Sequence, residues 1–388
     1  MSSEWTALIW LLPLCAIISW WLGRRSVRQN SNDLQTRIHP DYFRGLNFVL
    51  NEQPDKAIEV FVKMLEVDSE TVETHLALGN LFRRRGEVDR AIRIHQNLIA
   101  RPNLSRDDRA IAMLELGIDY MRSGLFDRAE SLFDELVQGG THTSQAYREL
   151  LSIYQQEKDW DNAIITARRL EYAESMSQHA VIAQFYCEKA EEMRARGDMT
   201  QARDNLRKAM NIDVNCARAS MLDGSMQQQD GKLKQAIRAY KRVEKQDPGY
   251  FSEIIPAMQR CYRSMDKLEE FMEYLQGVVN RHGDITAILT LAELIAEHDG
   301  EAAAVRFLAT ELKKRPTVKG VDQLIQYTLS LAQGTTRESL ISIKELTAKL
   351  LKNRSAYKCL QCGFDAKVLH WQCPSCKNWN TIKPVYGV

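Results

Sequence analysis

Small and aromatic residues recur along this chain in a pattern that repeats about every 34 residues. Six alanines, at spacings of 34, 38, 34, 39 and 34, set the register: Ala57, Ala91, Ala129, Ala163, Ala202 and Ala236. A small residue precedes five of them by twelve positions, as Gly45, Gly79, Gly117, Ala190 and Gly224. Aromatic residues stand nine positions before (Phe48, Phe82, Tyr120, Tyr154) or four positions after (Phe61, Phe133, Tyr240). Small residues let two helices approach and rings fill the groove between them, so each period predicts an antiparallel helical hairpin.

A 34-residue period of helical hairpins resembles the tetratricopeptide repeat (TPR). Six units are predicted, at residues 38–71, 72–105, 110–143, 144–177, 183–216 and 217–250. The extra residues near Asn103–Asp107 and Ser177–Val181 are interpreted as loop insertions. Continuing the register gives three degenerate units, at 251–284, 285–318 and about 319–352. The predicted fold class is therefore an all-α TPR superhelix of about nine hairpins over residues 38–352.

A stack of hairpins curves, and the first helices of its units line a concave surface that suits an extended peptide or a partner's helix. Four arginines fall at or beside inward positions of the repeat: Arg83, Arg84, Arg122 and Arg194. They predict a docking surface for an acidic or amphipathic partner. The alternative is that these arginines pair with nearby carboxylates on a solvated face, and the sequence leaves both interpretations open.

The N-terminal segment has the features of a membrane anchor. Trp5–Leu22 is an 18-residue stretch without a charge, which is just long enough to cross a hydrocarbon core of about 30 Å. Glu4 precedes it and Arg24, Arg25 and Arg28 follow it, the reverse of a cleaved signal peptide. Positive residues stay on the cytoplasmic side, so we expect an anchor at 1–23, a linker at 24–37 and the remainder in the cytoplasm.

The C-terminal residues 353–388 contain two Cys-x-x-Cys pairs separated by ten residues. Two such pairs facing each other form a tetrahedral site for one zinc or iron ion, with Cys359, Cys362, Cys373 and Cys376 as ligands. Gly363 supplies the turn after the first pair, whereas Lys377 replaces the equivalent glycine in the second. We predict a small rubredoxin-like or zinc-ribbon β domain that folds only with metal, because so few residues bury little apolar surface.

Composition and motifs narrow the function further. The net charge of +1, from 52 basic and 51 acidic residues, gives no overall field for nucleic acid. Phosphate-binding loops, nucleophile elbows and zinc-protease motifs are absent from the sequence, so we do not expect an enzyme. His370 is interpreted as a neighbour of the metal site and not as a ligand. Cys15, Cys187, Cys216 and Cys261 are scattered through helical segments, which favours reduced thiols.

Three functions compete at this stage. The anchor, the repeats and the missing catalytic set favour a membrane-tethered scaffold or adaptor. A four-cysteine iron site also suits a tethered electron carrier of the rubredoxin type, although ten intervening residues leave little room for the usual sheet. A ribbon that reads single-stranded nucleic acid, suggested by Lys358, Lys367, Lys377 and Lys383, is the weakest of the three, and we expect no nucleic acid partner.

The order of anchor, TPR units and the tail Tyr-Lys-Cys-Leu-Gln-Cys-Gly-Phe…Trp-Gln-Cys-Pro-Ser-Cys-Lys-Asn-Trp resembles the lipopolysaccharide assembly protein B (LapB) family of Gram-negative bacteria, over essentially the whole chain. The resemblance implies an inner-membrane adaptor that presents the lipid A deacetylase to the membrane-anchored AAA+ protease FtsH. It also implies a membrane-embedded regulator and lipopolysaccharide synthesis and export proteins as partners. A homodimer is left open.

The tail holds more aromatic residues than so small a ribbon needs: Tyr357, Phe364, Trp371, Trp379 and Tyr386. We expect several of them to pack on early or middle units of the array, with Trp371 contributing to docking. The metal site would then act as a structural clip and not as a redox centre.

Overall fold

A computed structural model describes residues 40–51, 53–67, 72–352 and 354–385 of the 388-residue chain. In this part, the helices follow one another as nine consecutive pairs: α2 (Pro40–Leu50) and α3 (Pro54–Val67); α4 (Val72–Arg84) and α5 (Val88–Ile99); α6 (Arg106–Arg122) and α7 (Phe126–Gly139); α8 (Thr143–Glu157) and α9 (Trp160–Glu174); α10 (His179–Ala195) and α11 (Met199–Ile212); α12 (Ala217–Gln229) and α13 (Leu233–Gln246); α14 (Phe251–Ser264) and α15 (Leu268–His282); α16 (Ile285–Asp299) and α17 (Glu301–Lys314); α18 (Val318–Leu331) and α19 (Thr335–Lys352). A short 3-10 helix, η1 (Pro248–Tyr250), joins α13 to α14.

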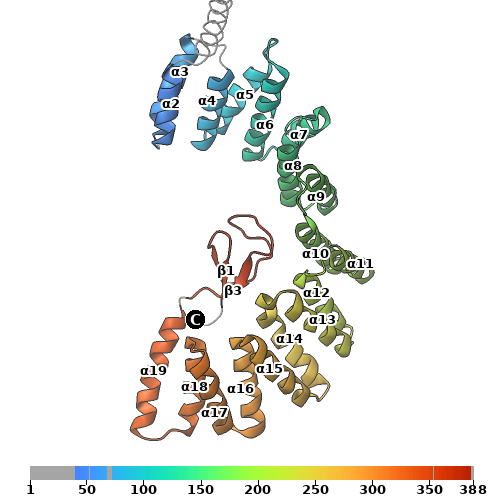
Figure 1. Cartoon of the computed structure of the whole chain (residues 1–388), viewed down its shortest axis with the longest axis vertical. Helices are drawn as coiled ribbons and strands as arrows, with labels where there is room; N and C mark the ends of the chain where they lie inside the picture. Colours follow the sequence, from blue (N-terminus) through green and yellow to red (C-terminus); the bar gives the residue numbers. More distant parts are fainter. Residues whose placement is uncertain (1–39, 52, 68–71, 353, 386–388) are drawn as a thin grey trace, which may run out of the picture. The chain divides into compact units, whose positions relative to one another are not determined.

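The chain divides into two compact units, Met1–Gln156 and Glu157–Val388. The first unit contains the helices from α2 to α8, and the second contains α9 to α19 together with the C-terminal strands. Within each unit, successive helices lie side by side as antiparallel hairpins (Figure 1). The predicted degenerate units 251–284, 285–318 and 319–352 correspond to α14/α15, α16/α17 and α18/α19, so the helical hairpins continue to the end of the array.

The glycine and aromatic positions of the repeat contact each other. A Cβ atom added to Gly117 would lie 2.5 Å from Cε1 of Phe133, and one added to Gly45 would lie 2.6 Å from Cζ of Phe61. Gly224 has the same relation to Tyr240, at 2.5 Å from Cε1. Side-chain carbons do not approach this closely, so the first helix needs a glycine where the ring of the second helix crosses it. This contact explains the sixteen-residue separation of glycine and ring in the sequence.

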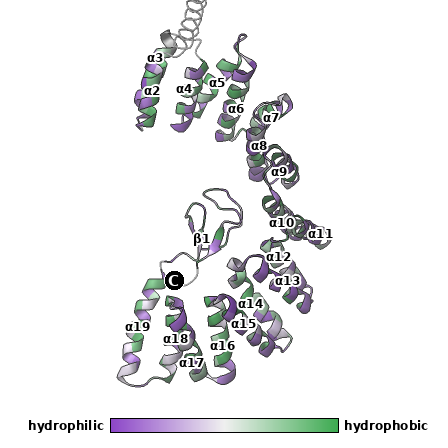
Figure 2. Ribbon diagram, viewed as in Figure 1, coloured by the Kyte–Doolittle hydropathy of each residue, from purple (hydrophilic) through white to green (hydrophobic). Residues whose placement is uncertain are grey.

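Each helix divides its residues between a buried and an exposed face, as the helical period requires. Figure 2 shows this division as hydrophobic and hydrophilic sides of the same helices. Helix α13 buries Ala236, Ile237, Tyr240 and Val243, while Arg238 on its other side is exposed. In the second unit, the largest apolar cluster runs from Ala217 to Leu312, and the partly buried side chain of Trp371 from the C-terminal tail packs against it.

The extra residues between units were predicted to be loop insertions, and the structure corrects this in part. Helices α6 and α10 each have 17 residues, against 13 for α4 and α12. Part of each insertion therefore lengthens the first helix of a hairpin. In α6, Ser105 caps the longer start by accepting a hydrogen bond from the Asp108 amide at 3.1 Å.

The tail forms a small three-stranded antiparallel sheet in the order β2–β1–β3. Its strands are β1 (Tyr357–Cys359), β2 (Asp365–Ala366) and β3 (Ile382–Pro384). Tyr357 is opposite Ala366 on one side and Pro384 on the other. We call residues 354–385 the ribbon.

None of the helices in the described ranges is both long and apolar enough to cross a membrane. The predicted anchor at 1–23 and linker at 24–37 lie outside these ranges.

Candidate metal centre

Two similar turns position the four tail cysteines. In the first turn, the Gly363 amide donates to the Cys359 carbonyl at 3.0 Å, and Gly363 has a φ of 77°. In the second, the Lys377 amide donates to the Cys373 carbonyl at 2.9 Å, and Lys377 has a φ of 59°. Lys377 thus adopts the left-handed conformation that glycine usually takes, and the second turn keeps its geometry at some steric cost.

The four sulfur atoms converge as a metal site requires. All four Sγ atoms lie within 4.8 Å of one another. The Sγ atoms of Cys359 and Cys376 are 3.8 Å apart, and those of Cys362 and Cys373 are 3.7 Å apart. A tetrahedron with metal–sulfur bonds of about 2.3 Å has edges of about 3.8 Å, so the donor set fits one zinc or iron ion.

Hydrogen-bond donors around the cysteines favour the thiolate that binds metal. Burial would raise the pKa of Cys359, but the Thr381 hydroxyl and the amides of Cys362 and Gln361 lower it to about 6. The Asn378 amide lowers the pKa of Cys376. Burial instead raises the pKa of Cys373 to about 11, so a bound cation is needed to hold this sulfur as a thiolate.

Tyr250 in η1 is the main point of contact between the array and the last strand of the ribbon. Its hydroxyl lies 2.8 Å from Oδ1 of Asn380 and 3.1 Å from the Ile382 carbonyl, and it donates to these two acceptors. The Lys383 ammonium stands 3.7 Å from the centre of the Tyr250 ring and forms an ion pair with Asp247. The two array residues that contact β3, Asp247 and Tyr250, therefore both come from the segment between α13 and α14.

Two tryptophans extend this contact on either side. Trp371 packs against Tyr250 with ring centroids 4.9 Å apart, and Arg218 of α12 lies 5.4 Å from the Trp371 ring centre. Trp379 meets Phe185 of α10 edge to face at 5.7 Å and Trp160 of α9 at 6.4 Å. The expected packing of tail aromatics on middle units is thus observed.

The remaining tail aromatics differ in their contacts. The Tyr357 hydroxyl lies 3.1 and 3.2 Å from the two carboxylate oxygens of Glu253 in α14. Phe364 packs inside the ribbon instead, against the cluster of Cys359, Cys373 and Ile382. Tyr386 lies outside the described residues.

Arg218 is a buried residue beneath Trp371 that the sequence analysis did not select. Its side chain is 2% exposed and pairs with Glu188 at 2.9 Å and also with Glu191, both from α10. It is the second residue of the predicted unit 217–250, which is an inward position of the repeat, so the register could have identified it. Arg218 lies under the ribbon and joins α10, α12 and Trp371.

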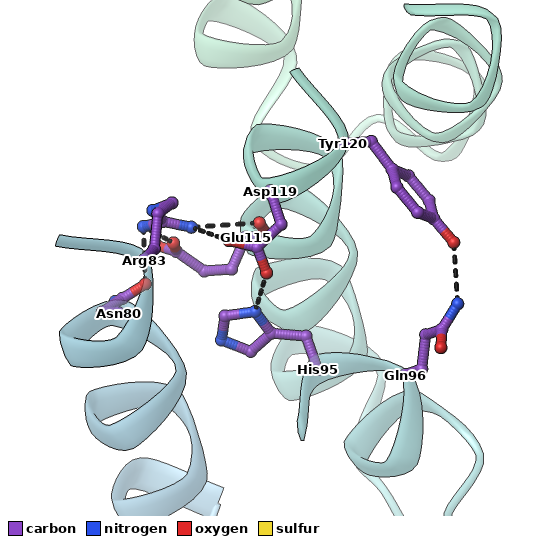
Figure 3. Close-up of polar contacts among 7 residues, drawn as sticks. All are labelled: Asn80, Arg83, His95, Gln96, Glu115, Asp119 and Tyr120. Atoms are coloured by element: carbon purple, nitrogen blue, oxygen red, sulfur yellow. Dashed lines mark hydrogen bonds and ion pairs between the residues drawn. The ribbon is translucent and has the colours of Figure 1, made fainter. Parts of the chain in front are cut away.

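The arginines predicted to bind a partner divide between the two units, and their surroundings differ. Arg83 is largely buried in the first unit, where its guanidinium contacts Asp119 at 2.8 Å and also pairs with Glu115 (Figure 3). This is the intramolecular pairing that the sequence left open as the alternative. Arg84 and Arg122 are exposed, and Arg194 is half-buried in the second unit.

The Arg83 network also contains a histidine that takes the place of a repeat aromatic. His95 is fully buried, four residues after Ala91, and its Nδ1 atom lies 2.6 Å from Oδ2 of Asp119. A Cβ atom on Gly79 would lie 2.3 Å from its Nε2 atom. His95 therefore fills the ring position of the second hairpin and adds a polar contact to α6 (Figure 3).

Comparisons with known proteins agree with this architecture. Residues 357–384 match a family described as a rubredoxin metal binding domain, and residues 74–110 and 114–178 match tetratricopeptide repeat families. Lipopolysaccharide assembly protein B of Escherichia coli (strain K12) is 40% identical over 379 residues, which cover 97% of each chain. The Haemophilus influenzae protein of that name is 36% identical over 387 residues, again with 97% of each chain covered. The crystal structure of MamA protein is 22% identical and covers 47% of this chain and 94% of its own, with a TM-score of 0.32.

Stacked TPR hairpins with a rubredoxin-type metal ribbon packed on them define an adaptor class of protein and not an enzyme. More particularly, the chain belongs to the lipopolysaccharide assembly protein B family, because identity and coverage extend over nearly the full length of both chains.

Proposed function

We propose that this protein is a membrane-anchored cytoplasmic adaptor that regulates lipopolysaccharide synthesis. The observation that carries the proposal is the end-to-end relation to a relative named for lipopolysaccharide assembly, at 40% identity with 97% of both chains covered. A relation of this extent includes the array, the ribbon and the apolar N-terminal stretch together.

The finer mechanism follows from the family resemblance. The TPR array holds the lipid A deacetylase, and the anchor at 1–23 keeps this client beside an FtsH-like AAA+ protease in the inner membrane. A membrane-embedded regulator and the synthesis and export proteins act on the same adaptor. The exposed Arg84 and Arg122 and the half-buried Arg194 remain candidates for partner contacts, whereas Arg83 would have to exchange its existing carboxylate partners.

The ribbon has a structural part in this proposal. A zinc or iron ion on Cys359, Cys362, Cys373 and Cys376 would supply the folding energy of the ribbon. Trp371, Trp379 and β3 then hold α9, α10, α12 and η1 together. The electron-carrier alternative is not favoured, because the family relation is to an assembly protein. The tryptophans of the ribbon also pack against the helical array.

The proposal is tested by the lifetime of the deacetylase in cells. Loss of the full chain should lengthen the half-life of the deacetylase when the protease is present and should have no effect when the protease is absent. Deleting 1–23 should reproduce the loss, and an unrelated membrane anchor in its place should restore the short half-life. A deacetylase half-life that is the same with and without this chain would refute the proposal.

Partner identity is tested separately by crosslinking in intact membranes. Photoreactive residues at positions 84, 122 and 194 should capture the deacetylase or the protease, whereas one at the exposed position Lys313, in the second helix of its hairpin, serves as a control. Equal capture at all four positions would remove the assignment of the client to the arginine positions.

A further inference from the structure

A second candidate site lies on the second helices of two consecutive hairpins, α13 and α15. A pocket of about 850 Å³ is lined by α13 and α15 and is bounded by Pro248. Its cationic lining comes from both helices: Arg238, Lys241, Arg242 and Lys245 from α13, and Arg281 from the end of α15, next to His282. This volume is in the range of about 300–1,000 Å³ that is typical of small-ligand pockets.

The acidic residue in the lining does not neutralise this charge. Glu244 accepts hydrogen bonds from the Tyr274 hydroxyl at 2.7 Å and from Nη2 of Arg281 at 2.7 Å. These contacts, with His282, outweigh burial and lower the pKa of Glu244, so it stays ionised and balances Arg281. The charges of Glu244 and Arg281 therefore neutralise each other, and the other cations of the lining are not balanced by Glu244.

Three cations remain without a carboxylate. Arg242 pairs with Asp223 at 2.6 Å. Arg238, Lys241 and Lys245 form no ion pair within the described ranges, and Lys241 instead stands 4.3 Å from the centre of the Tyr274 ring. Arg238 and Lys245 are exposed, so their charges are available to a ligand.

The cluster of like charges on α13 lowers the stability of the helix, and helix packing does not compensate for it. Lys241 and Arg242 lie three or four residues from both Arg238 and Lys245, so the four share a helix face, where like charges repel each other. Cations in a last turn offset the helix dipole, which accounts for Lys245 and Arg281. The dipole does not account for Arg238 and Lys241, because both lie in the middle of α13.

We propose that this pocket binds the phosphate group of an anionic ligand. A phosphate offers three oxygens and up to two charges to three convergent cations, and both arginine and lysine are common phosphate ligands. A single carboxylate would match only one of the three. The phosphate belongs either to a lipid headgroup or to a soluble phosphate compound, and the experiment below separates these sources.

The test uses the full chain in lipid nanodiscs and measures how fast each lysine is acetylated, by mass spectrometry. In phosphatidylcholine discs, pyrophosphate is titrated. In a second set, phosphatidylglycerol is mixed into the discs without pyrophosphate. Binding at about ten times Kd should slow acetylation of Lys241 and Lys245 about tenfold, whereas Lys234 and Lys313, which do not line the pocket, should be unchanged.

The two arms give different results for the two sources. Protection by pyrophosphate indicates a soluble phosphate compound, and protection only in phosphatidylglycerol discs indicates a lipid headgroup. Equal protection by sulfate, protection by polyglutamate but not by phosphate, or no protection in either arm would overturn the proposal.

A matched pair of variants localises the effect. Arg238→Gln removes an exposed, unpaired cation and should raise Kd about tenfold, so that the same ligand concentration slows acetylation of Lys241 and Lys245 only about twofold. Lys234→Gln makes the same charge change on the same helix outside the pocket and should leave protection unchanged. If both variants weakened protection equally, the binding would be a general charge effect, and the assignment to this pocket would be wrong.

Discussion

The indole ring of Trp371 stands over the guanidinium of Arg218, with 5.4 Å between the Arg218 Cζ atom and the ring centre. Arg218 also forms ion pairs with Glu188 and Glu191 of α10, which orient its guanidinium. A buried cation that receives an aromatic face from a distant segment gives the ribbon a defined docking position.

Trp371→Ala should release the ribbon without removing its metal. The substitution removes the contacts with Tyr250 and Arg218, which together contribute about 2–3 kcal/mol. We expect faster proteolysis near residues 354–356 and an unchanged metal content. His370→Ala is the control next to Trp371, and loss of metal from Trp371→Ala would show that docking and metal binding cannot be separated.

Removal of the metal should unfold the ribbon and leave the helices folded. Thiolates that lose their ion repel and protonate, and the small sheet buries too little apolar surface to persist. Treatment with a thiol-reactive agent and a chelator, or the double variant Cys359→Ser and Cys362→Ser, should shift tryptophan fluorescence with little change in helical circular dichroism. Added zinc should reverse the chelator effect only in the unmodified protein. An unchanged proteolysis pattern after metal loss would contradict the clip.

Lys377→Gly should stabilise the ribbon. Lys377 has a φ of 59°, in a region that costs a non-glycine residue about 1–2 kcal/mol. Glycine removes this cost but also raises the conformational entropy of the unfolded chain, which offsets part of the gain. We expect a net gain of about 0.5–1 kcal/mol, measured as tighter metal retention against a competing chelator. Gly363→Ala places a side chain at the equivalent φ of 77° and should weaken retention by a similar amount.

Gly117→Ala should destabilise the first unit by about 1–3 kcal/mol. Its new methyl group would lie 2.5 Å from Phe133, and a buried ring between two helices cannot move aside without opening the hairpin. Gly139→Ala is the matched control, because the nearest atom to its Cβ is 3.7 Å away and the position is exposed. Urea unfolding of the full chain in detergent would measure both; equal midpoints for the two variants would refute the steric explanation.

The sequence predicted most of the array because its signal is steric. Gly117 and Phe133 touch, and so do Gly224 and Tyr240, so the spacing of small and aromatic residues records the helix contact directly. His95 fills the same position, but the repeat pattern considered only phenylalanine and tyrosine there, so His95 was missed. The repeat register was reliable where packing is tight and less so between units, where part of each insertion before α6 and α10 is helical.

The polar contacts were harder to predict, because the charge of a residue does not show whether its side chain is paired or exposed. Arg83 and Arg84 are adjacent in sequence, yet the first is paired with Asp119 from the next hairpin and the second is exposed. The partner of Arg83 lies 36 residues away, and that of Tyr250 lies 130 residues away. No local pattern encodes such pairs, whereas the two Cys-x-x-Cys turns encode their own geometry.

The contact between Tyr250 and Asn380 also affects how the second unit unfolds. In a stack of hairpins each unit touches its neighbours only, so unfolding can begin at one end and spread stepwise. The ribbon joins α9, α10, α12 and η1 at once, and its docking must follow their formation in folding. We therefore expect a rigid block in the first half of the second unit, from α9 to η1, with the slowest hydrogen exchange there, while α18 and α19 open independently.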